Sequence, residues 1–161
     1  MNPRVAPFAD LYKFDTTIFN NALKDIKPED LHKRPSNNCA SLNWLAGHLV
    51  NSRYYIAHLI GGSDEYEFSN LYNGDGQPLK EPSAYLPIGE IQKAFDSISE
   101  KLMKRLNELN DSDIDKKLKD KWPHGDDTHF GAISFMCWHE GWHIGQMSVL
   151  RKHLGYKGLA G

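Results

Sequence analysis

Residues 128–154 read THFGAISFMCWHEGWHIGQMSVLRKHL, and this stretch decides the fold. Its apolar side chains recur three and four positions apart, which is the spacing that places them along one face of an α-helix. Gly155 follows directly, and glycine readily takes the left-handed backbone conformation that ends a helix. We therefore expect a helix that begins near residues 128–130 and runs to about Leu154.

Three earlier segments have the same period, and none alternates apolar and polar residues as a strand would. Ser41 is a suitable N-cap for the second of them, and Gly61 follows its end. The pattern predicts an all-α protein, a four-helix bundle that forms one domain over residues 1–161. The expected earlier helices are residues 6–25, 42–60 and 88–109, with a further helical turn within 112–118 and a tight turn at 122–125.

A long loop is expected between the second and third helices, over residues 61–87. Glycine and proline interrupt any period there, while several aromatic residues add apolar mass. Loops of this length inside a compact domain are often functional, so one interpretation is a wall of a binding pocket. The other is a connection across the bundle that its aromatic side chains hold in place.

Composition excludes several classes of protein. Hydrophobic residues make up 40% of the chain and charged residues 25%, which is typical of a soluble globular protein. A net charge of -2 offers no basic surface for nucleic acid. The first residues contain neither a signal peptide nor a membrane span, so we expect a cytoplasmic protein with no membrane partner. Cys39 and Cys137 are expected to be unpaired and to act as small buried apolar residues.

Histidine is over-represented, with eight in 161 residues, and three of the eight are predicted to face the core. His139 and His143 are four residues apart, so they project from one face of the last helix. A helical wheel centred on His139 places Gln146 on the same face. A wheel centred on His48 places Tyr55 on the inner face of the second helix. The other five are expected to be solvated or to cap helices: His32, His58, His124, His129 and His153.

Buried imidazoles need partners, and two arrangements would supply them. In the first, His48, His139 and His143 bind one divalent metal ion and leave coordination positions open for water or substrate. In the second, the same rings are core residues that hydrogen-bond to groups such as Gln146 and Tyr55. The sequence leaves both open.

Residues 139–143 also fit H-E-x-x-H, the zinc-binding pattern of metalloproteases. The match is formal, because zincins need a further ligand downstream and the chain has no acidic residue after His143. Glu140 is therefore expected to be an ion-pair partner on the flank of the helix, or a residue near the open side of the metal.

Two short motifs together resemble a known family. Residues 42–49, LNWLAGHL, and residues 139–146, HEGWHIGQ, are similar to the DinB-like (DinB/YfiT) superfamily of putative metalloenzymes, and the similarity extends over essentially the whole chain. The resemblance implies a four-helix bundle in which His48, His139 and His143 bind zinc, nickel or a related ion. It further implies a homodimer and, as in some relatives, a reaction that depends on a low-molecular-weight thiol. It does not imply DNA binding, which agrees with the absence of nucleic acid that the charge predicts.

These observations predict a metal-dependent enzyme, a transferase or hydrolase, that acts on a small molecule. The ion would activate a bound water or thiol. Gln146, Tyr55 and Glu140 are the candidates for orienting ligands or substrate. The alternative is a stress protein that binds a metal or a small molecule without catalysis.

Overall fold

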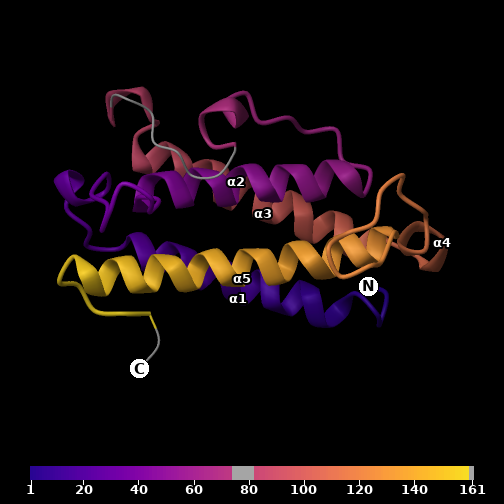
Figure 1. Ribbon diagram of the computed structural model, residues 1–161. Helices are drawn as coiled ribbons and strands as arrows, with labels where there is room; N and C mark the ends of the chain where they lie inside the picture. The colour runs from indigo at the N-terminus through magenta and orange to yellow at the C-terminus, as the bar shows by residue number, and fades with distance from the viewer. Residues whose placement is uncertain (74–81, 160–161) are drawn as a thin grey trace.

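A computed structural model describes residues 1–73 and 82–159, and within them the protein is a bundle of four long helices (Figure 1). Helix α2 packs against α3 and α5, and α1 packs against the same two helices from the other side. The described residues contain no strand, and the all-α, four-helix prediction is confirmed. The long helices are α1 Ala6–Leu23, α2 Leu42–Leu59, α3 Ile88–Glu108 and α5 His129–His153.

The helix ends lie within two residues of the predicted positions, because local signals set them. The Ser41 hydroxyl accepts the Trp44 N–H at 3.2 Å and caps α2. Gly61 and Gly155 have φ values of 100° and 87°, which side-chain-bearing residues rarely adopt. The predicted turn before residue 118 is the short helix α4, Asp111–Ile114, which Asn110 caps.

Three single-turn 3₁₀ helices lie in segments that were expected to be loop. Such turns have little hydrophobic periodicity and are easily missed in a sequence. They are η1 Pro28–Asp30, η2 Ser69–Leu71 and η3 Pro82–Ala84.

Two apolar clusters form the core, one toward each end of the bundle. Phe19, Leu49 and Met147 belong to the first cluster, and Tyr12 and Ile98 belong to the second. A buried guanidinium, Arg53, lies between them, 4.0 Å from the centre of the Phe95 ring and 5.5 Å from that of Tyr12. The core is therefore interrupted by a charged group at mid-height.

The part of the long loop that the structure describes is held by aromatic packing, which confirms that interpretation for residues 61–73. Tyr66 and Phe68 pack against the first core cluster, and Tyr72 is completely buried. The Tyr72 ring lies over Gly47, where any Cβ would overlap it. Residues 74–81 of the predicted loop lie outside the described residues.

The cysteine prediction is correct for one residue and wrong for the other. Both are free thiols, and Cys137 is buried as expected. Cys39 is only half-buried, because it belongs to a loop at the edge of a pocket, where its sulfur lies 3.3 Å from the Ser36 hydroxyl. Among residues 1–73 and 82–159, no helix combines the length and the apolar character that a membrane span requires.

Candidate metal centre

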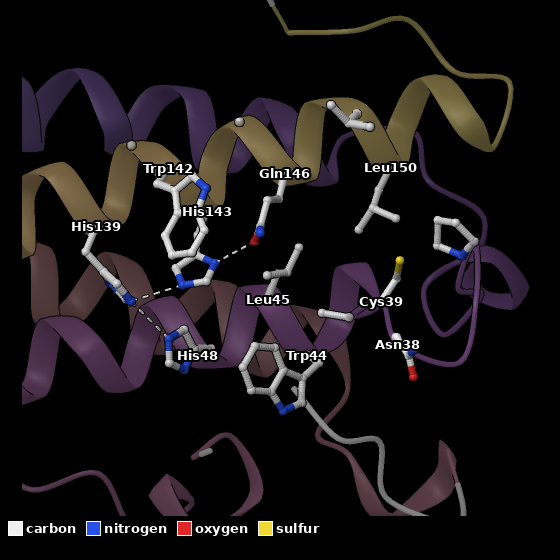
Figure 2. Close-up of a pocket in the computed structure, with 15 residues that line it drawn as sticks. Asn38, Cys39, Trp44, Leu45, His48, His139, Trp142, His143, Gln146 and Leu150 are labelled. Atoms are coloured by element: carbon white, nitrogen blue, oxygen red, sulfur yellow. Dashed lines mark hydrogen bonds between the residues drawn. The ribbon is translucent and has the colours of Figure 1, made fainter. Parts of the chain in front are cut away.

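Three imidazole rings meet between α2 and α5. The Nε2 atom of His139 lies 3.4 Å from Nε2 of His48 and 3.0 Å from Nε2 of His143 (Figure 2). One ring nitrogen from each residue lies within 4.8 Å of the other two. Two nitrogens bound to one tetrahedral zinc ion would be about 3.3–3.4 Å apart, so the separations of His139 from His48 and from His143 are close to those of a metal site.

Two of the three rings have their orientation fixed by hydrogen bonds on the far side. Nδ1 of His48 donates to the backbone carbonyl of Tyr72 at 2.9 Å. Nδ1 of His143 donates to Oε1 of Gln146 at 2.7 Å. A proton on Nδ1 leaves a lone pair on Nε2, and both of these lone pairs are directed at His139.

Hydrogen bonding among the rings cannot satisfy this arrangement. The Nε2 atoms of His48 and His143 are both acceptors, and His139 carries at most one proton on the Nε2 atom between them. One of the two contacts therefore lacks a proton. A shared cation would use all three lone pairs at once, so the residues present fit a divalent ion better than the hydrogen-bonded core arrangement.

All three imidazoles are held neutral. Burial lowers the pKa of His48 and His143, although the bonds to Tyr72 and Gln146 partly oppose the shift. Burial, together with the other two rings, lowers the pKa of His139 to about 4. A neutral imidazole is the form that binds metal, so the site needs no proton release at pH 7.

Tyr55 does not belong to the site, and the expectation that it faces inward is wrong. Its side chain is 52% exposed and its ring lies 6.3 Å from that of Trp122. Gln146, in contrast, contacts His143 directly as expected.

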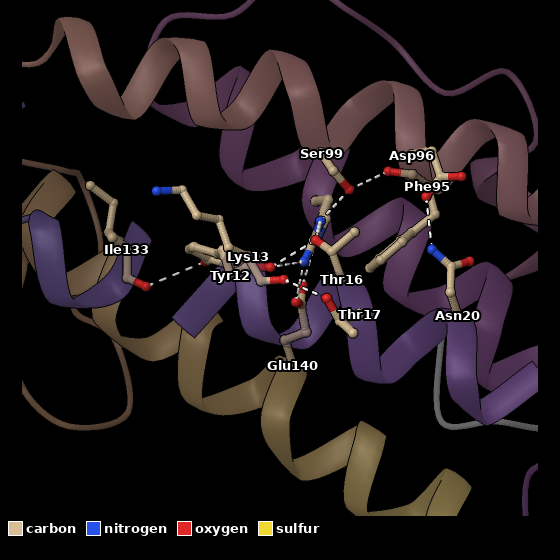
Figure 3. Close-up of polar contacts among 11 residues, drawn as sticks. Tyr12, Lys13, Thr16, Thr17, Asn20, Phe95, Asp96, Ser99, Ile133 and Glu140 are labelled. Atoms are coloured by element: carbon tan, nitrogen blue, oxygen red, sulfur yellow. Dashed lines mark hydrogen bonds and ion pairs between the residues drawn. The ribbon is translucent and has the colours of Figure 1, made fainter. Parts of the chain in front are cut away.

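Glu140 is an ion-pair partner as expected, but it is buried in the bundle rather than on the helix flank. It is 1% exposed and pairs with Arg53 through two hydrogen bonds, Nε to Oε2 at 2.8 Å and Nη2 to Oε1 at 2.5 Å. Figure 3 shows Glu140 converging with Tyr12, Thr16 and Ser99 in the bundle interior. The pair was missed because Arg and Glu are usually assigned to solvent.

The burial of this pair also explains why Tyr55 was wrongly predicted to face inward. Successive residues of a helix are about 100° apart, so the buried face of α5 is centred near Glu140, and His139 lies at its edge. In α2 the corresponding angle between His48 and the buried Arg53 is about 140°, and Tyr55 is displaced into solvent. The histidines therefore lie at a seam between two helices, beside solvent.

Among the remaining histidines, His58 and His153 are exposed as expected. His129 is only 7% exposed, so the expectation that it is solvated is wrong. It is the first residue of α5, and α4 packs against that helix. His124 bonds the Ser134 hydroxyl at 3.2 Å and does not approach the cluster.

A pocket of about 850 Å³ opens beside the three rings, between α2, α5 and the loop before α2. Its walls carry two indoles, Trp44 and Trp142, that stack on His48 and His143 with ring centres 4.7 and 5.2 Å apart. The seam thus gives a small molecule direct access to the imidazole nitrogens.

Comparison with known proteins agrees with this architecture. The family model of the DinB superfamily matches residues 12–147. YfiT from Bacillus subtilis, described as a probable metal-dependent hydrolase with an unusual four-helix bundle topology, superposes with a TM-score of 0.67 at 12% identity. The alignment covers 98% of this chain and 91% of YfiT. At 12% identity it shows that the two proteins share a fold. No curated protein matches the chain.

Proposed function

This chain belongs to the DinB superfamily, and from that premise we propose that it is a metal-dependent hydrolase whose ion is held by His48, His139 and His143. The observation that carries the proposal is the convergence of three Nε2 atoms, two of them with their Nδ1–H groups already bonded elsewhere. The description of YfiT as a metal-dependent hydrolase supports the same reaction class.

Each part of the site has a role in this proposal. A bound divalent ion lowers the pKa of a coordinated water and so supplies a nucleophile near neutral pH. The Tyr72 carbonyl and the Gln146 amide hold the rings of His48 and His143 so that their Nε2 lone pairs face inward. The adjoining pocket holds the substrate against that point.

A catalytic site is favoured over a purely structural one because no fourth protein ligand is in place among the described residues. Structural zinc sites are normally closed by four ligands. Glu140 is committed to Arg53, and His124 is bonded to Ser134. The cluster of candidate ligands contains three residues, which leaves room for water or substrate.

The test begins with metal content. Untagged wild-type protein should contain about one equivalent of zinc, nickel or a related ion by elemental analysis. His48→Ala should contain almost none while keeping the helical circular dichroism of the wild type. Equal metal content in the two proteins would refute the assignment of the ligands.

Activity is then screened with ester and amide substrates, and with thiol-transfer substrates as the competing reaction class. Turnover that requires the ion and disappears in His48→Ala supports an enzyme. Full metal occupancy with no turnover in either class would favour the non-catalytic metal-binding protein.

A homodimer remains a prediction, which sedimentation of the purified protein would test. The outer face of α5 carries two stacked indoles, Trp138 and Trp142, with 59% and 52% of their surface exposed. An exposed apolar pair of this kind is consistent with contact to a second copy.

A further inference from the structure

We propose that the pocket beside the histidines selects an uncharged, mainly apolar acyl compound, an ester or amide, whose carbonyl group lies at the histidine end. The proposal rests on the function proposed above and adds the chemical class of the substrate. Charge, wall composition and the free amide nitrogen of Gln146 support it.

The walls of the pocket are apolar along most of its length. Leu45 and Leu150 line it, and Trp44 and Trp142 contribute indoles from the two opposite helices, α2 and α5 (Figure 2). Both indoles stack on ligand histidines, so their positions are fixed relative to the reaction centre. An aromatic or branched aliphatic group would bury apolar surface against these walls.

No lysine, arginine, aspartate or glutamate is among the described residues that line the pocket. Arg34 lies nearby, but its guanidinium donates to the backbone carbonyls of Asn37 and Cys39. These bonds hold the loop at the pocket edge. A charged substrate group held against these walls, away from the ion, would lose hydration without gaining an ionic partner, which is unfavourable.

Gln146, on the Nδ1 side of His143, can recognise a substrate carbonyl in the pocket. Gln146 uses Oε1 to accept from His143, which leaves its amide nitrogen directed elsewhere. That nitrogen has no hydrogen-bond partner among the described residues, and the side chain lines the pocket. The amide N–H groups can therefore donate to a substrate oxygen, which is the acceptor that an ester or amide provides.

The first experiment compares three ligands with the same phenylbutanohydroxamate chain on cobalt-loaded protein. The probes are 4-phenylbutanohydroxamate and its para-carboxylate and para-aminomethyl derivatives. Cobalt absorption reports binding at the ion, and tryptophan fluorescence reports entry into the pocket. The uncharged probe should bind at least tenfold more tightly than either charged probe and should change both signals. Equal or tighter binding of a charged probe would overturn the proposal.

A second experiment changes the charge of the pocket rim. Val149 lines the pocket and is 66% exposed, so substitutions there leave the core intact. Val149→Lys should improve binding of the carboxylate probe at least threefold relative to Val149→Gln, and Val149→Glu should do the same for the aminomethyl probe. Unchanged selectivity in both variants would show that the probes do not lie along this wall.

The outcome remains interpretable if the protein binds no cobalt. Metal-free protein is then titrated with 4-phenylbutanamide and the matching charged amides, with tryptophan fluorescence as the signal. A preference for the uncharged amide would retain the pocket assignment while the metal proposal fails. No preference would reject the pocket assignment independently of the metal.

Discussion

The histidine cluster and the Arg53–Glu140 pair are neighbours in the chain, but they differ in how completely their hydrogen-bonding groups are satisfied. His139 and Glu140 are adjacent on α5, and both clusters join α2 to α5. All five N–H donors of Arg53 are used, by Glu140, Thr16, Ser99 and the Tyr12 carbonyl. The Nε2 lone pairs of the histidines face one another with too few protons between them.

The difference separates a structural cluster from a binding site. A buried charge whose hydrogen-bonding groups are all satisfied has nothing left to offer a ligand, and it rigidifies the bundle. Converging acceptors that lack donors raise the free energy of the folded state, and an ion bound between them would remove that cost. The four predictions that follow test this distinction, from the largest expected effect to the smallest.

Glu140→Ala should cost about 3–5 kcal/mol of unfolding free energy, because it leaves the Arg53 charge buried without its partner. Urea denaturation of metal-free protein measures the loss. The control is Glu108→Ala, at a surface pair with Arg105 where about 1 kcal/mol or less is expected. Similar losses in the two variants would contradict a structural role for the buried pair.

Zinc should stabilise the wild type by about 2.7 kcal/mol when the free ion is at one hundred times its dissociation constant. Thermal unfolding with and without zinc measures this gain. His143→Ala should lose most of the gain, because the remaining two imidazoles form an incomplete site. A gain that survives in His143→Ala would mean that zinc binds elsewhere on the protein.

Gly47→Ala should weaken zinc binding by about tenfold, since an added Cβ displaces the Tyr72 ring and with it the carbonyl that orients His48. Competition with a chromogenic chelator measures the affinity. Tyr72→Phe is the matched control: it keeps the ring and the carbonyl and removes only the hydroxyl that accepts the Leu86 N–H. Equal affinities in wild type and Gly47→Ala would show that Tyr72 does not orient the ligand.

The two regions should respond to pH with opposite signs in metal-free protein. The pKa of His139 is lowered to about 4, so its contribution to stability is present above about pH 6.5 and is lost as the pH falls toward 4. Burial and the nearby Glu140 raise the pKa of Asp15 to about 7, against the pull of Arg53. The protonated native carboxyl therefore contributes stability at low pH that is lost as the pH rises from 4 to 7.

Two variants separate these contributions in urea denaturation curves between pH 4 and 8. Asp15→Asn should make stability rise more steeply with pH than in wild type, because only the histidine contribution remains. His139→Ala should flatten the curve or reverse its slope. Parallel curves for all three proteins would contradict the assignment of these shifts.

Local signals in the sequence were sufficient for the helices and for the choice of ligands. Periodicity, the Ser41 cap and the glycines at 61 and 155 act within a few residues, so they can be interpreted without knowledge of the fold. The spacing of His139 and His143 likewise requires only a helix.

The sequence could not decide which face of each helix is buried. Arg53 and Glu140 lie 87 positions apart, and each looks like a solvent-exposed residue until the other is placed beside it. Centring the wheels on the histidines therefore rotated α5 by about 100° and α2 by about 140°, and the rotation of α2 brought Tyr55 inside. Likewise, nothing in the segment around Tyr72 indicated that its carbonyl would accept from His48, 24 residues earlier.

By itself, then, the sequence determined an all-helical chain, its helix ends and three histidines able to share an ion. Tertiary structure decided that Glu140 belongs to the core, that Gln146 and the Tyr72 carbonyl orient His143 and His48, and that the histidine cluster opens into an apolar pocket. The physical reason is that helix formation depends on neighbouring residues, whereas desolvation of a polar group depends on partners that only the packed bundle brings together.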